Sequence, residues 1–72
     1  PVSIIHYNKE DPLTTTGGVQ SFAKGLNQIF KSVEYMTPNN LDVKYILNNQ
    51  VPVICDNQMV SDIPNDIPVI GF

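Results

Sequence analysis

A nearly continuous apolar run at residues 51–55, Val-Pro-Val-Ile-Cys, most narrows the folds open to this 72-residue chain. A strand with water on one face alternates apolar and polar residues, whereas an unbroken apolar run belongs to a strand covered on both faces, as in parallel sheets. Residues 2–7 are similarly rich in β-branched and aromatic residues, and residues 67–72 form another apolar run. The sequence therefore predicts several buried strands.

One strongly periodic helix is predicted at residues 19–33. Its apolar residues recur at three- and four-residue intervals, the spacing of a helix that buries a single face. They are Val19, Phe22, Ala23, Leu26, Ile29, Phe30 and Val33. Polar residues fill the opposite side, so this helix is expected to lie on a larger apolar surface.

Shorter elements complete the pattern. Residues 34–37 are interpreted as a second strand, and residues 41–47 as a second helix that follows a capping pair of asparagines. Strand-like alternation leaves a strand open as the alternative for 41–47, and residues 58–66 are interpreted as a polar connection. Strands that alternate with helical segments predict an α/β fold, a partial Rossmann-like open parallel sheet with flanking helices.

Composition removes several classes of function. The net charge is -3, and the four lysines are scattered with no arginine, which disfavours nucleic-acid binding because that needs clustered basic residues. The one cysteine, Cys55, is expected to be a buried thiol, and one histidine without ligand-like acidic spacing predicts no metal site. No apolar run approaches the roughly 20 residues of a membrane span. A cytoplasmic chain without a transmembrane segment is expected.

The last apolar run, residues 67–72, has no closing helix after it. A chain of this length buries only roughly 60% of its unfolded surface if it folds alone. We therefore expect residues 1–72 to be an incomplete N-terminal Rossmann-like domain that lacks a further, C-terminal domain.

The candidate site lies at one edge of the predicted sheet. Ligands of open parallel sheets bind outside the carboxyl ends of the strands, and that edge is expected to collect the strand end from His6 to Asn8, the pair Gly17 and Gly18, and the pair Asp56 and Asn57. Adjacent glycines allow positive φ and a close approach of the backbone to a ligand, and free N–H groups at a helix start favour an anion such as phosphate. No dinucleotide or P-loop glycine spacing occurs.

Structural interpretations of the same residues stay open. The glycine pair can serve only as a sharp loop-to-helix turn. A lone histidine such as His6 is more often a hydrogen-bonded structural residue, and an acidic residue such as Asp56 commonly caps the turn that follows a strand.

The order of these features resembles the start of the N-terminal domain of GT-B-fold glycosyltransferases, especially family 4 (glycosyl transferases group 1). Residues 17–20, Gly-Gly-Val-Gln, match the element that opens the first helix in that family, after a polar loop that holds Thr14 to Thr16. The resemblance implies transfer of a sugar from a nucleotide-sugar donor to an acceptor. It implies that Gly17 and Gly18 approach the donor, that no cofactor is needed, and that a C-terminal donor-binding domain is missing, so the chain alone is inactive.

A second resemblance competes. Residues 53–59 look like the phospho-acceptor strand end of two-component receiver domains, with Asp56 as the acceptor. Receivers carry paired acidic residues after the first strand, where this chain has His6-Tyr7-Asn8, and the gap from Asp56 to Ile67 is short for the intervening helix. A small non-enzymatic α/β binding module is the third alternative.

Overall fold

A computed structural model describes residues 2–11 and 17–72, apart from the side chain of Val19. Strands and helices alternate along these ranges. The elements are β1 (Ile4–Tyr7), α1 (Gly18–Ile29), β2 (Val33–Met36), α2 (Val43–Asn49), β3 (Val53–Cys55), the 3-10 helix η1 (Asn57–Asp62) and β4 (Val69–Gly71).

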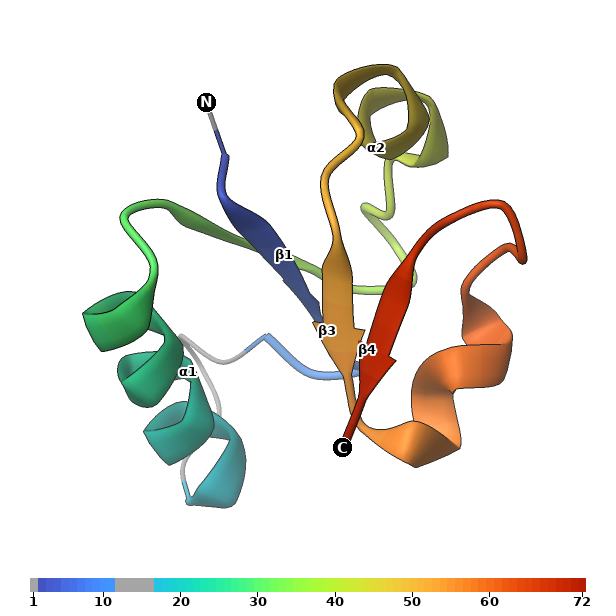
Figure 1. The fold of residues 1–72 in the computed structure, drawn as a ribbon. Helices are drawn as coiled ribbons and strands as arrows, with labels where there is room; N and C mark the ends of the chain where they lie inside the picture. The colour runs from blue at the N-terminus through green and yellow to red at the C-terminus, as the bar shows by residue number, and fades with distance from the viewer. Residues whose placement is uncertain (1, 12–16) are drawn as a thin grey trace.

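The four strands form one all-parallel sheet in the order β2-β1-β3-β4. The chain moves outward from β1 to β2 and then returns past β1 to β3, so the winding direction reverses between β1 and β3. Figure 1 shows α1 on one face of the sheet and α2 with η1, the orange helix, on the other. The predicted α/β fold with a partial Rossmann-like parallel sheet is confirmed.

Helix α1 is shorter than the periodicity predicted. Phe30 is already extended, with φ -108 and ψ 141, and its N–H donates to the Leu26 carbonyl oxygen to close the last turn. The predicted helical residue Val33 instead opens β2, where it pairs with Ile4. Pairing with β1 therefore overrides the helical spacing at this end. Ile29, expected on the buried face, is 76% exposed, whereas Ala23 and Leu26 are buried as predicted.

Helix α2 confirms the helical interpretation over the strand. The predicted asparagine cap is wrong, because Asp42 caps the start: its carboxylate accepts a hydrogen bond from the Tyr45 N–H at 3.0 Å. Gln50 ends it in the left-handed conformation, with φ 53. Residues 58–66 were predicted as a plain polar connection, but η1 (Asn57–Asp62) covers the first part of this stretch, and Ile63 behind it is buried.

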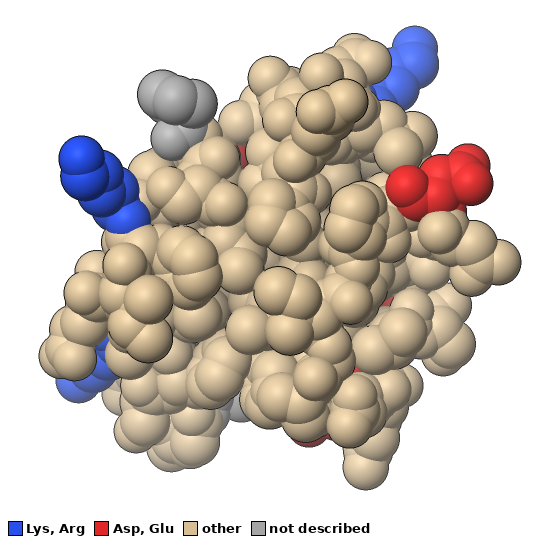
Figure 2. Space-filling model, in the orientation of Figure 1, with Lys and Arg blue, Asp and Glu red and all other residues tan. Residues whose placement is uncertain are grey.

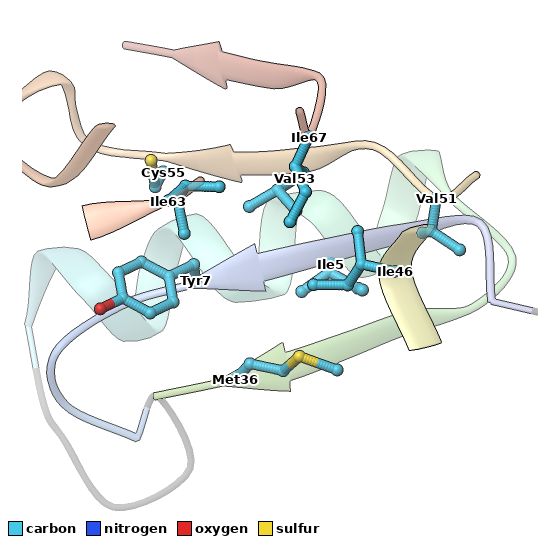
Figure 3. Close-up of a cluster of buried hydrophobic side chains, with 9 residues drawn as sticks. All are labelled: Ile5, Tyr7, Met36, Ile46, Val51, Val53, Cys55, Ile63 and Ile67. Carbon is cyan, nitrogen blue, oxygen red and sulfur yellow. The ribbon is translucent and has the colours of Figure 1, made fainter. Parts of the chain in front are cut away.

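The main apolar core fills the space between the sheet and the α2 and η1 layer (Figure 3). Each buried aliphatic side chain contributes about 1.5 to 3 kcal/mol relative to exposure. The members, all nearly inaccessible, are Ile5, Tyr7, Met36, Ile46, Val51, Val53, Cys55, Ile63 and Ile67. The burial predicted for Cys55 is confirmed.

Candidate functional site

A pocket of about 290 Å³ opens where the winding of the sheet reverses, at the carboxyl ends of β1 and β3. This is the general position of ligand sites in doubly wound α/β sheets. Its described lining residues are His6, Asn8, Gly18, Phe22, Asp56, Met59 and Phe72. The structure thus brings together four of the residues predicted from the sequence, His6, Asn8, Gly18 and Asp56.

The start of α1 forms one rim of the pocket. Gly17, its N-cap residue, has φ 93 and ψ -141, a conformation that L side chains rarely adopt. Of the two glycines only Gly17 uses positive φ, because Gly18 already lies in the helix. A β-carbon at either glycine would meet no heavy atom of the described residues within 4 Å. The loop threonines Thr14 to Thr16 lie outside the described residues.

The first N–H groups of α1 have no partner within the helix. No side chain of the described residues caps them, and the first turn contains no acidic residue. The positive end of the helix dipole adds to their attraction for negative charge. Among the groups around the pocket, this rim therefore carries the hydrogen-bond donors best suited to an anion.

His6 forms part of the pocket wall and is only 3% exposed. Its ring centroid lies 5.1 Å from that of Phe22 and 5.7 Å from that of Tyr35, which it meets edge-on. Among the described residues its Nδ1 has no hydrogen-bond partner. Burial lowers the pKa of His6 from its ordinary value, so the imidazole is neutral at neutral pH. The interpretation of His6 as a hydrogen-bonded structural residue therefore lacks support at this nitrogen.

Asp56 both caps the helix that follows it and lines the pocket. Its Oδ1 accepts a hydrogen bond from the Gln58 N–H at 2.9 Å, which caps η1. The same carboxylate borders the pocket. Asn57, expected in the cleft, is not among the described lining residues, since its side chain lies beside Gly71, in the space that a β-carbon there would fill.

An aromatic wall joins α1 to the end of β4. The rings of Phe22 and Phe72 stack with centroids 4.2 Å apart and planes inclined by 21°. Phe72 is fixed by its backbone, because its N–H donates to the Cys55 carbonyl and its own carbonyl accepts from the Asn57 N–H. Helical spacing identified Phe22, but the role of Phe72 depends on strand pairing that no local pattern reveals.

Asn8 continues β1 into the pocket and is 7% exposed. Its N–H donates to the Met36 carbonyl at 3.0 Å, and its Nδ2 donates to the Glu10 carbonyl at 2.8 Å. One of the two Nδ2 hydrogens is therefore engaged in holding the loop, which leaves the amide oxygen and the other Nδ2 hydrogen as the groups available to a ligand.

Figure 2 shows one face of the molecule, whose centre consists mostly of uncharged residues. The lysines visible on this face lie at its margins. None of the described residues around the pocket is a lysine, and Asp56 is the charged one among them.

Over residues 2–11 and 17–72, no three histidine, cysteine, aspartate or glutamate side chains gather to hold a metal ion. Over the same ranges, no helix has the length and apolar character required to cross a bilayer.

No protein-family model, curated protein or solved structure matches this chain. The fold and the pocket therefore define its class, a doubly wound α/β domain with a small mixed-polarity pocket at the reversal point of its parallel sheet.

Proposed function

We propose that this chain is the N-terminal part of a glycosyltransferase that moves a sugar from a nucleotide-sugar donor to an acceptor. The observation that carries the proposal is the junction of the pocket with the open start of α1, at Gly17 and Gly18. The Gly-Gly-Val-Gln element on which the family resemblance rests stands at this junction.

The chemistry of sugar transfer fits such a junction. As the glycosidic bond of the donor breaks, the leaving diphosphate gains negative charge, and fixed N–H donors stabilise that charge. The positive φ of Gly17 turns the chain into α1, and no described side chain lies within 4 Å of a β-carbon built at Gly17 or Gly18. A diphosphate or the attached sugar can then approach the backbone closely, while a domain that supplies the other donor contacts completes the site.

A receiver-like domain is the second candidate, favoured by the place of Asp56 at the carboxyl end of β3 in the sheet order β2-β1-β3-β4. Against it, the residues that follow β1 into the pocket supply Asn8 instead of paired acids. One oxygen of Asp56 is also engaged as the cap of η1. A non-enzymatic binding module would use the same pocket without transfer.

The decisive experiment compares two glycines of the same helix in the full-length protein. Gly18→Val places a branched side chain at the pocket rim, whereas Gly25→Val adds the same group to the middle of α1, where a β-carbon also meets nothing within 4 Å. We expect Gly18→Val to lower turnover of nucleotide-sugar donors by about tenfold or more. Gly25→Val should leave turnover unchanged. Release of nucleoside diphosphate from uridine and guanosine diphosphate sugars measures the rate.

Full turnover in the Gly18→Val protein would show that the glycines at the start of α1 do not contribute to donor binding. Absence of transfer together with phosphorylation of Asp56 by acetyl phosphate would favour the receiver-like alternative instead. Circular dichroism of both valine variants checks that α1 still forms.

A further inference from the structure

The polar groups inside the pocket accept hydrogen bonds more readily than they donate them. Asp56 offers a carboxylate with acceptors only, and Asn8 offers its amide oxygen beside the one Nδ2 hydrogen that is not bonded to the Glu10 carbonyl. His6 is neutral, so its imidazole has one donor and one acceptor nitrogen. A ligand that fits these groups must itself donate hydrogen bonds.

No cation balances the Asp56 carboxylate within the pocket lining. All four lysines of the sequence are described residues, and none borders the pocket. The residues outside the described ranges, Pro1 and Pro12 to Thr16, contain no charged side chain. A phosphate or carboxylate inside the pocket would therefore face a like charge in a partly desolvated space, where repulsion is weakly screened.

The remaining walls are apolar and partly aromatic. Phe22 and Phe72 supply the stacked wall, and Met59 of η1 supplies a flexible apolar side chain. Flat apolar surfaces beside a few polar groups suit a ring that has C–H groups on one face and hydroxyl groups at its edge. A volume of about 290 Å³ is at the small end of ligand sites and matches one such ring.

We propose that Asp56 makes this pocket selective for an uncharged, hydroxyl-bearing ring and excludes anionic groups from it. Hydroxyl groups donate to Asp56 and Asn8 and both donate to and accept from neutral His6. The identity of the ring as a sugar rests on the proposed function, whereas the selection against charge rests on the pocket alone. The diphosphate of a donor then lies outside the pocket, at the N–H groups that start α1.

The test uses Asp56→Asn, because asparagine keeps the cap of η1 and removes the charge. Methyl α-glucoside, methyl α-galactoside, methyl α-mannoside and inorganic pyrophosphate are titrated into the natural chain and the variant, and protein NMR signals give the dissociation constants. We expect at least one glycoside to shift the ring signals of Phe22 and Phe72, with affinity about tenfold weaker in Asp56→Asn. Pyrophosphate should bind Asp56→Asn as well as or better than the natural chain.

Asp42→Asn is the matched control, since Asp42 caps α2 in the same way and the change in net charge is the same, with no contribution to the pocket. It should leave glycoside affinity unchanged. The proposal is overturned if no glycoside binds, if Asp56→Asn binds glycosides as well as the natural chain, or if pyrophosphate displaces them from Phe22 and Phe72. The last outcome is read on the natural chain and needs no variant to fold.

The two proposals fail separately. If Gly18→Val lowers turnover and Asp56→Asn does not, the proposed transferase function is supported and the proposed selectivity of the pocket through Asp56 is rejected. Glycoside binding that depends on Asp56, without transfer from any nucleotide-sugar donor, would keep the selective pocket and reject the transferase.

Discussion

The two faces of the sheet are built from neighbouring residues of the same strands yet differ in character. On the α2 and η1 face, Ile5, Val53 and Cys55 are fully buried among other apolar side chains. On the α1 face Ile4 is also buried, but His6 has no partner for Nδ1 among the described residues, and Ile70 is 51% exposed. Because successive strand residues point to opposite faces, one face can be committed to stability while the other carries the pocket.

The largest expected effect tests this division with one substitution on each face. Ile5→Ala should lower the free energy of unfolding by about 2 to 5 kcal/mol, since it removes buried methyl groups and leaves a cavity. Ile70→Ala should cost under about 1 kcal/mol, because half of this side chain is already in water. Urea unfolding followed by circular dichroism gives both values. Equal costs would show that the α1 face is packed as tightly as the other.

A smaller effect is expected from the one side-chain hydrogen bond that crosses from β1 to η1. The Tyr7 hydroxyl donates to Asp62 Oδ2 at 3.3 Å, and burial, with Asp62 adding to it, raises the pKa of Tyr7. Tyr7→Phe should lower the free energy of unfolding by about 0.5 to 1.5 kcal/mol. The same urea titration measures it.

Tyr45→Phe serves as the comparison, since Tyr45 packs against the same core and its hydroxyl makes no such bond. A change within about 0.5 kcal/mol is expected there. A Tyr7→Phe protein as stable as the Tyr45→Phe protein would mean that the Asp62 bond adds nothing to the closed face.

The smallest expected effect is a dependence of the free energy of unfolding on pH, caused by His6 on the α1 face. Burial lowers the pKa of His6 in the folded protein, so below the unfolded value of about 6.5 the unfolded chain binds more protons. The stability associated with neutral His6 is therefore fully present above pH 6.5 and is lost as the pH falls toward the lower folded pKa. The urea midpoint should be lower at pH 5.5 than at pH 7.5.

His6 is the one histidine in the sequence, so His6→Leu should flatten this slope. A slope that persists in the leucine variant would assign the pH dependence to another group and leave His6 without a titrating role.

Strand positions and the start of α1 were predictable because they depend on local patterns. The apolar runs located β1, β3 and β4, and Gly18 marked the start of the helix. The parallel sheet then brought His6, Gly18 and Asp56 to one edge without any further information. Topology alone therefore predicted about half of the pocket.

The rest of the site depends on contacts between distant segments. Phe72 reaches Phe22 only because β4 pairs with β3 and its last N–H bonds to Cys55. Met59 enters the lining because η1 forms where a plain connection was predicted. The failure at Ile29 has the same origin, since the end of α1 is set by the pairing of Val33 with Ile4 and not by helical spacing.

The central place of β1 also governs the order in which the protein can assemble during synthesis. Ile5 pairs with Glu34 on one side and with Val53 on the other, so β1 is synthesised before both of its partners. Until β3 has left the ribosome, one edge of β1 offers unpaired backbone groups beside apolar side chains. Such an edge can pair with another chain. Helix α1, which forms from local contacts and follows β1 directly, is the element available to shield that strand in the interval.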